Sequence, residues 1–293
     1  MGSVRTPGRP AKLVFVHHSS GENWLADENG GLGIALRDNG YFVSDTNYHW
    51  GPQGVGDTTD IGHLWLWFRG PESSVYLDAL YAENERHSQY SRLPDEPAGE
   101  NEIVMFKGCY PNSALKGTPA DVVPPISSNP LRGESCWTEH HTLANAKGIY
   151  EDILHYFATR QDRLFVVITA PPLVDPAYAA NARVLNTWLV HEWLRGYPHR
   201  NVAVFDYYNV LTSSGGDPHT NDLGKDTGSH HRFSSGRIEH TVGREDGADP
   251  DVLKYPYVPG NNHPSRAGNM KATAEFVPLL NVFCERWVSA VHL

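Results

Sequence analysis

Four segments of the chain carry groups that could take part in chemistry, and each lies beside an apolar run. A hydroxyl, Ser19, follows the first run, residues 13–16, at a point where a nucleophile would be exposed. A glycine turn with Gly56 follows the second run, the amide of Asn112 follows the third, and His263 precedes the last helical stretch. A hydroxyl, a backbone N–H, an amide and an imidazole are the groups that nucleophilic attack on a carbonyl uses.

Each of these groups also has a common structural use. A serine at the end of a strand is most often the N-cap of the following helix, because its oxygen accepts a hydrogen bond from an orphan backbone N–H. A glycine-rich segment such as residues 54–59 is more often only a turn. The case for chemistry therefore depends on whether the fold brings the four segments together.

The hydrophobic pattern predicts the elements that would position these segments. Five short runs are rich in β-branched or aromatic residues and bounded by turn formers, which predicts buried strands. They cover residues 13–16, 41–43, 103–106, 164–169 and 202–205. Apolar residues three or four apart predict helices around residues 149–157 and 178–193. A last helix is expected to begin near Ser265 and to kink or restart at Pro278.

Strands that alternate with helices predict one parallel sheet with helices on both faces. We therefore expect an α/β fold, a three-layer α/β/α sandwich with a parallel five-stranded sheet, as a single domain over residues 12–290. Residues 60–100 and 212–260 are expected to be loop excursions over the mouth of the sheet. Because ligands bind beyond the carboxyl ends of parallel strands, the segments after the strands belong at one edge.

The composition limits the classes of partner. The chain has 293 residues with 24 Lys and Arg against 34 Asp and Glu, a formal net charge of −10. Because the charges are scattered, nucleic acid and anionic membranes are not expected partners. No run has the length of a membrane span, and residues 13–16 are too short for a signal-peptide core. We expect a soluble protein; residues 1–3 are typical of an expression remnant, so secretion stays open.

Histidines, cysteines and aromatic residues each allow two interpretations. The chain has 16 histidines, but adjacent ones point in different directions and no H-x-x-x-H pattern occurs, so neither a metal nor another cofactor is expected. Cys109 and Cys136 could form a loop-fixing disulfide or remain two buried thiols. The aromatic run of residues 64–68 is either core packing or a platform for stacking sugars.

The ordered set of segments resembles the SGNH, or GDSL-type, hydrolase superfamily. Ser19 lies at the position of the family's serine, although His17 and His18 stand where the family has Gly-Asp. Gly56, within Gly-Val-Gly-Asp-Thr-Thr, is similar to the glycine of the family's second motif.

The later segments extend this resemblance toward the C-terminus. Asn112 falls in the third motif, and His263 with Gly268 is similar to the family's His-Pro-x-x-x-Gly. The resemblance covers residues 12 to 290 in the family's order and implies the flavodoxin-like SGNH hydrolase fold.

The resemblance implies a serine hydrolase that acts on carboxylic esters. Ser19 would be the nucleophile and His263 its general base, and an acyl-enzyme would form. The backbone N–H groups of Ser19 and Gly56 and the side-chain amide of Asn112 would stabilise the charge on the carbonyl oxygen. The aromatic and polar excursions favour acyl groups on carbohydrate, such as O-acetyl groups, as the substrate.

The acid of the family's triad is missing from its expected position. The family places it three residues before the histidine, where this chain has Gly260. Asp249 or Asp251 from the preceding loop could orient the imidazole, as could a backbone carbonyl. The alternative function is therefore a catalytically silent relative that binds a glycan or another small ligand at the same place.

Overall fold

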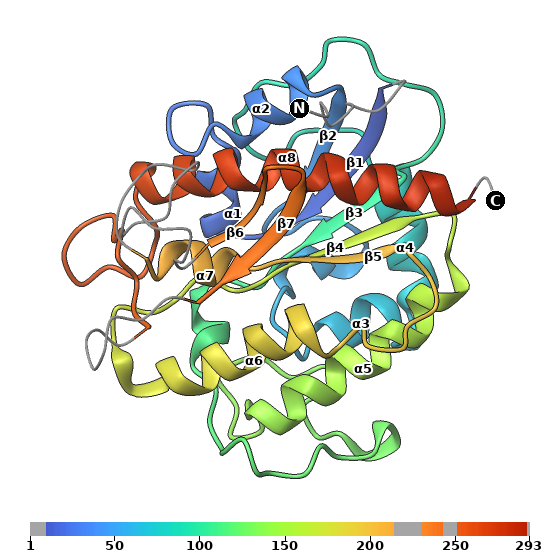
Figure 1. The fold of residues 1–293 in the computed structure, drawn as a ribbon. Helices are drawn as coiled ribbons and strands as arrows, with labels where there is room; N and C mark the ends of the chain where they lie inside the picture. Colours follow the sequence, from blue (N-terminus) through green and yellow to red (C-terminus); the bar gives the residue numbers. More distant parts are fainter. Residues whose placement is uncertain (1–9, 214–229, 243–250, 292–293) are drawn as a thin grey trace.

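The computed structural model describes residues 10–213, 230–242 and 251–291 and contains a sheet of five parallel strands in the order β2-β1-β3-β4-β5 (Figure 1). The strands are β1 (Ala11–Val16), β2 (Tyr41–Thr46), β3 (Ile103–Phe106), β4 (Leu164–Ile168) and β5 (Val202–Phe205). The predicted α/β fold with a parallel five-stranded sheet is confirmed.

Because both faces of the sheet are covered, β3, β4 and β5 are wholly apolar, whereas β1 contains Lys12 and β2 ends in the polar residues 44–46. Along β1, the side chains of Leu13 and Phe15 enter one hydrophobic core, whereas those of Val14 and Val16 enter the other. This alternation follows from the two-residue period of a strand. A parallel sheet buried on both faces therefore appears in the sequence as short continuous hydrophobic runs.

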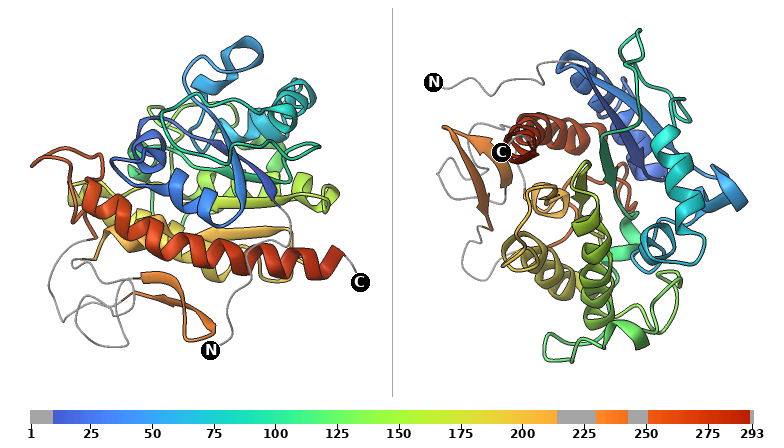
Figure 2. Two further views of the ribbon diagram at one scale, coloured as in Figure 1. Left: turned by 90° about the horizontal axis from the view of Figure 1, so that it is seen from above. Right: turned by 90° about the vertical axis from the view of Figure 1, so that its right-hand side faces the viewer.

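The helices form a layer on each face of the sheet, as the two further views in Figure 2 show. One face is covered by α1 (Ser19–Leu25), α2 (Leu32–Asp38), α7 (Tyr207–Leu211) and α8 (Arg266–Val291). The other face is covered by α3 (Leu64–Phe68), α4 (Ser73–Ala82), α5 (Leu143–Thr159) and α6 (Ala179–His191). Short 3₁₀ turns are η1 (Pro52–Asp57), η2 (Tyr110–Ser113), η3 (Ile126–Ser128) and η4 (Pro176–Tyr178).

Residues 60–100 are not only a loop excursion, and this expectation is wrong for their first part. They include α3 and α4, and α3 packs against α5, with the rings of Phe68 and Phe157 centred 5.0 Å apart. Leu64, Trp67 and Phe68 are buried because their spacing of three and four residues places them on one helix face. The core-packing interpretation of the aromatic run is therefore confirmed for these residues.

The second expected excursion, residues 212–260, is described only in part. It contains an antiparallel hairpin of β6 (His230–Ser234) and β7 (Arg237–Thr241), with β6 packed against α8. Residues 214–229 and 243–250, including Asp249, lie outside the described residues. The last helix also differs from expectation, because α8 runs through Pro278 as one helix of 26 residues and does not restart.

The order of the strands reverses direction at one point of the sheet, between β1 and β3. After β1 the chain adds β2 on one side, and it then adds β3, β4 and β5 on the other side. The carboxyl ends of β1 and β3 therefore border the topological switch point, where open α/β sheets bind their ligands. None of the helices in the described part of the chain has the length and apolar character of a membrane span.

Candidate active site

Ser19 and His263 face each other although they are 244 positions apart in the sequence. Ser19 is the first residue of α1, just beyond the carboxyl end of β1, and His263 lies shortly before α8. Because α1 and α8 pack together, the hydroxyl and the imidazole meet, with 2.9 Å between Ser19 Oγ and His263 Nε2. This distance is short enough for direct proton transfer.

The side chain of Asn261 determines which ring nitrogen of His263 carries the proton. Asn261 Oδ1 accepts the backbone N–H of His263 at 2.7 Å, so the oxygen of this amide, and not its nitrogen, points at the histidine. The same oxygen lies 3.1 Å from His263 Nδ1, which must therefore be the protonated nitrogen. Nε2 is left with its lone pair toward Ser19, as a general base requires.

The surroundings of His263 favour its neutral form. Burial lowers the pKa of the imidazole, and the positive charge of Lys107 lowers that pKa further. The ring of Tyr110 packs edge-on against His263, with 4.9 Å between the ring centres. The imidazole is therefore ready to accept a proton at neutral pH.

Among the described residues, no carboxylate accepts a hydrogen bond from the ring of His263. Asp251 pairs with Arg183 at 3.0 Å, whereas the ring of His263 contacts Ser19, Asn261 and Tyr110. The interpretation of Asp251 as a displaced acid is therefore wrong, and the one that invokes Asp249 falls outside the described residues. The side-chain amide of Asn261 contacts Nδ1 of His263, where a carboxylate or a backbone carbonyl was expected.

Gly56 lies near the site, but its N–H is already used. It donates to the carbonyl of Trp50 at 2.8 Å. A Cβ atom added to Gly56 would lie 2.3 Å from the carbonyl oxygen of Asn47, so the glycine is required by a close approach of two backbone segments.

The side chain of Asn112 is also fully engaged and only 1% exposed. Its Nδ2 donates to Asp60 Oδ1 at 2.7 Å and to the carbonyl of Cys109 at 3.2 Å, and its Oδ1 accepts the N–H of Ile61 at 2.8 Å. The expectation that Gly56 and Asn112 present free donors is therefore not met. The N–H of Ser19 differs, because it belongs to the first turn of α1, which has no preceding helical carbonyl to bond.

The two histidines before Ser19 support the surrounding backbone. His18 Nε2 donates to the carbonyl of Gly56 at 2.6 Å, and its Nδ1 lies 3.1 Å from Thr59 Oγ1. His17 Nε2 lies 3.0 Å from Asp45 Oδ2 in a fully buried pair. Both histidines therefore have contacts within the protein that are typical of packing.

Lys107, Ser20 and Cys109 form a polar cluster beneath Ser19 that the sequence analysis did not assign. Lys107 is 1% exposed, and its Nζ donates to Ser20 Oγ and to the carbonyl of Gly108. Burial lowers the pKa of this ammonium group to about 8. Cys109 Sγ lies 3.3 Å from Ser20 Oγ and 3.8 Å from Ser19 Oγ. The available signal was a lysine directly after the wholly apolar strand β3.

Two exposed tyrosines contact the segments that carry Ser19 and His263. Tyr48 is 50% exposed and stacks on His18, with 4.1 Å between ring centres. Tyr257 is 63% exposed, and its backbone N–H donates to the carbonyl of His263 at 2.8 Å. Each of the two segments is therefore next to an exposed aromatic residue.

The described residues include two of the cysteines discussed above and no cluster of metal-ligand side chains. Cys109 and Cys136 are free thiols, which decides between the two interpretations of the sequence. Across residues 10–213, 230–242 and 251–291, no group of three His, Cys, Asp or Glu side chains could hold a metal ion.

Comparison with known proteins gives similarity in fold alone. No family model and no curated protein matches the chain. A family two carbohydrate esterase from Clostridium thermocellum in complex with cellohexaose aligns over 96% of this chain and 66% of its own, with 11% identity and a TM-score of 0.40. A carbohydrate esterase with divergent catalytic and non-catalytic binding functions aligns over 68% of this chain and 57% of its own, with 12% identity and a TM-score of 0.29.

The likeness does not distinguish between functions. Bacillus thuringiensis TubZ in GDP-form protofilaments has the same TM-score of 0.29, with 14% identity over 67% of this chain and 44% of its own. The chain thus spans less than two thirds of the length of the solved proteins that it matches. Function must therefore be argued from the site itself.

Proposed function

We propose that the protein is a serine hydrolase that cleaves ester bonds, with Ser19 as nucleophile and His263 as general base. The observation that carries this proposal is the 2.9 Å contact between Ser19 Oγ and the unprotonated Nε2 of an imidazole that Asn261 orients. A serine held this way is typical of an activated nucleophile.

The first half of the reaction forms an acyl-enzyme. His263 Nε2 takes the proton of Ser19 as Oγ attacks the ester carbonyl carbon, and the electrons of the C=O bond move to its oxygen. The imidazolium then gives this proton to the leaving alcohol oxygen as the C–O bond breaks. The acyl group stays on Ser19 as an ester.

The second half of the reaction releases the acid. Water gives a proton to His263 Nε2 and attacks the acyl carbon, and Ser19 Oγ leaves with the proton that the imidazolium returns to it. The products are a carboxylic acid and the free enzyme.

The negative charge of the tetrahedral intermediate needs a stabilising environment. The N–H of Ser19 at the start of α1 and the buried ammonium of Lys107 are the groups that supply positive potential in our proposal. Gly56 and Asn112 could contribute as first expected only if their present hydrogen bonds open on substrate binding.

Acyl groups on carbohydrate are the substrate class that we propose. Residues 64–68 are not the expected sugar platform, because the helix they form is packed against α5. The exposed side chains of Tyr48 and Tyr257 support a carbohydrate substrate instead, since aromatic faces offer a flat apolar surface to a sugar ring.

A silent relative that binds a glycan is the second candidate, and one observation favours it. An amide, rather than a carboxylate, faces His263 Nδ1, so no negative charge at this position stabilises an imidazolium ion. The two candidates differ in whether Ser19 reacts.

Labelling with a fluorophosphonate probe tests the proposal, because only an activated serine reacts. We expect the wild type to be labelled, Ser19→Ala to lose labelling, and the exposed Ser128→Ala to keep it. Hydrolysis of p-nitrophenyl acetate and of acetylated sugars should follow the same pattern. A folded wild type that neither reacts with the probe nor releases acetate, yet binds the sugar, would establish the silent alternative.

A further inference from the structure

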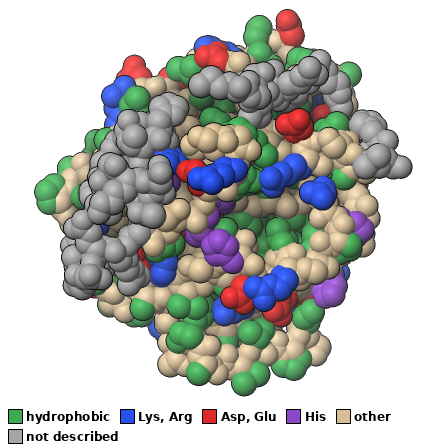
Figure 3. All heavy atoms as spheres, in the orientation of Figure 1, with side chains coloured by type: hydrophobic (Ala, Val, Ile, Leu, Met, Phe, Trp, Pro, Cys, Tyr) green, Lys and Arg blue, Asp and Glu red, His purple; other side chains and the backbone are tan. Residues whose placement is uncertain are grey.

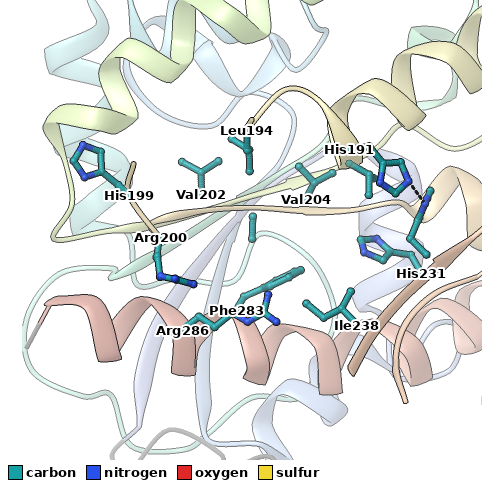
Figure 4. A pocket seen from close by; sticks show the side chains of 13 residues that line it. His191, Leu194, His199, Arg200, Val202, Val204, His231, Ile238, Phe283 and Arg286 are labelled. Carbon is teal, nitrogen blue, oxygen red and sulfur yellow. Dashed lines mark hydrogen bonds between the residues drawn. The ribbon is translucent and has the colours of Figure 1, made fainter. Parts of the chain in front are cut away.

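A hollow of about 540 Å³ lies along β5 and shares no residue with the Ser19 site. It is bordered by α6, by α8 and by the hairpin of β6 and β7, as Figure 4 shows. Its size is within the range of about 300 to 1,000 Å³ that is typical of small-molecule sites.

The floor and walls of this β5 pocket are apolar. Val202 and Val204 of β5 form its floor and are only 8% and 6% exposed. Leu194, Phe283 and Ile238 contribute further apolar surface from three different parts of the chain. The pocket therefore suits an apolar body.

Two arginines line the β5 pocket. They are Arg200 and Arg286, both are exposed, and neither forms an ion pair with any described residue. The same two arginines also line a neighbouring hollow of about 520 Å³, to which Glu285 contributes as well, so they stand where the two hollows meet. No aspartate or glutamate lines the β5 pocket within the described residues, although the whole chain has a net charge of −10.

The pictures show how these side chains are arranged. In Figure 3, Lys and Arg side chains gather on this face beside a hollow with hydrophobic side chains inside it and a histidine at its edge. In Figure 4, Arg200 and Arg286 lie in the space between β5 and α8, whereas His191 and His231 lie at the other end. His199 lies at the same end as Arg200, so imidazole groups are present at both ends of the β5 pocket.

The histidines at the end of the pocket away from the arginines are held by internal hydrogen bonds. His240 Nε2 donates to Asp206 Oδ2 at 2.8 Å, and its Nδ1 faces His191 Nε2 at 2.9 Å. His231 Nδ1 accepts the N–H of Asp206 at 2.9 Å, and burial lowers the pKa of this histidine to about 3. The guanidinium groups of Arg200 and Arg286 are positively charged at neutral pH.

We propose that the β5 pocket binds an organic anion, whose apolar body lies against Val202, Val204 and Phe283 and whose anionic group pairs with Arg200 and Arg286. Guanidinium groups bind carboxylate, sulfonate and phosphate oxygens through paired N–H donors. An added β-strand is a poorer occupant, because the outer edge of β5 is recessed among α6, α8 and the hairpin.

Two fluorescent probes that differ by one charge test the proposal. 8-Anilinonaphthalene-1-sulfonate carries the anion, and N-phenyl-1-naphthylamine has nearly the same apolar body without it. We expect the sulfonate to bind the wild type at least about tenfold more tightly than the neutral amine, and added salt to weaken only the sulfonate. Equal affinity for the two probes would overturn the proposal.

Variants locate the binding to this pocket. Arg200→Gln combined with Arg286→Gln should weaken sulfonate binding by about tenfold or more and leave amine binding unchanged. The exposed Arg195→Gln, outside the pocket, is the matched control and should bind as the wild type does. Ala203→Trp, which fills the floor, should remove binding of both probes, and circular dichroism checks that it folds. Sulfonate binding that survives the double arginine change would overturn the assignment.

Competition identifies the class of anion. Octanoate and octyl phosphate should each displace the sulfonate probe, and the tighter of the two names the headgroup. Octanol and inorganic phosphate should displace it poorly, since each lacks one half of the ligand. Displacement by octanol as effective as by octanoate would contradict the role of the arginines. Ester hydrolysis at Ser19 gives an independent readout, because none of these changes touches that site.

Discussion

In the mechanism that we propose, Asn261 performs one of the two tasks of a triad acid. Its oxygen accepts from the backbone N–H and from Nδ1 of His263, which holds the ring and fixes the tautomer. A carboxylate would also stabilise the imidazolium ion that forms when Ser19 loses its proton. The reaction in our proposal therefore proceeds with the correct geometry but with a less stabilised charge.

Replacing this amide by an acid should raise activity. We expect Asn261→Asp to increase kcat for p-nitrophenyl acetate by about tenfold to a hundredfold, because the carboxylate adds charge stabilisation to a geometry that already exists. The kinetic pKa of His263 should rise at the same time. The pH dependence of kcat/KM measures both effects.

The neighbouring asparagine supplies the control for this change. Asn262→Asp introduces the same charge one residue away, where the side chain accepts the N–H of Val174 and does not contact the ring. It should leave kcat nearly unchanged. If Asn261→Asp moves neither kcat nor the pH profile, Asn261 does not act on His263 as described.

Lys107 should set the pH at which the site becomes active. The positive charge of Lys107 lowers the pKa of His263, so removing the charge in Lys107→Met should move this pKa upward. The base works in its neutral form, so activity rises with pH through the pKa of His263, and the midpoint should shift to higher pH in the variant. We also expect a lower kcat, because the charge that stabilises the intermediate is lost.

The exposed Lys116→Met is the matched control, with the same loss of charge away from Ser19. Its pH profile should follow the wild type. A midpoint that stays in place in Lys107→Met would show that the lysine has only a structural role.

Some contacts of the Ser19 site could be predicted from the sequence, whereas others could not. The approach of Ser19 and His263 was implied by the resemblance of the ordered segments to the SGNH superfamily. Asn261 was not recognised because the expected acid lay one residue earlier, at Gly260, whose φ of +81° turns the chain before the histidine. The bonds that occupy Gly56 and Asn112 depend on loops whose course no local pattern contains.

At the scale of elements, buried strands were the most predictable feature. The runs at residues 103–106 and 202–205 match β3 and β5, because side chains buried on both faces leave no polar position. The hairpin of β6 and β7 was missed because its buried positions are polar. His230 is paired with Glu275 and Arg232 with Glu239, and composition alone does not reveal such pairing.

The stability of the η1 turn should depend strongly on Gly56. In Gly56→Ala the new Cβ would lie 2.3 Å from the Asn47 carbonyl oxygen and 2.7 Å from Trp50 Cβ, so the backbone must move. We expect the free energy of unfolding to fall by about 1 to 3 kcal/mol, the usual range for overpacking. Urea denaturation followed by circular dichroism measures this change.

Gly196→Ala is a suitable comparison. Its φ is +84°, but no atom lies within 4 Å of the added Cβ, so only the left-handed backbone is strained. The free energy of unfolding of this variant should fall by about 1 kcal/mol. A smaller loss in Gly56→Ala than in Gly196→Ala would contradict the close approach described for η1.

At the scale of the whole molecule, buried neutral histidines should make the fold sensitive to mild acid. Burial lowers the pKa values of His18, His63 and His141, and that of His231 from 6.5 to about 3. Below pH 6.5 the unfolded chain binds protons that the folded chain does not, so the free energy of unfolding falls as pH decreases. One such histidine contributes up to about 1.4 kcal/mol per pH unit.

Urea midpoints measured between about pH 8 and about pH 4 test this expectation. His231→Gln should reduce the slope of stability against pH, because one of the neutral histidines is gone, whereas the exposed His155→Gln should keep the slope of the wild type. Identical slopes in His231→Gln and the wild type would contradict the assignment.

Ser19 and His263 are 244 positions apart in the sequence, which also matters for how the site is assembled. A ribosome synthesises the proposed nucleophile long before the proposed base, and α1 is held beside the sheet by α8, which follows His263. In our proposal, a nascent chain that stops before His263 therefore has no hydrolytic activity even when most of its sheet has folded. Activity in a cell-free translation should thus appear only after His263 has been made, and a truncation between β5 and His263 should leave no turnover.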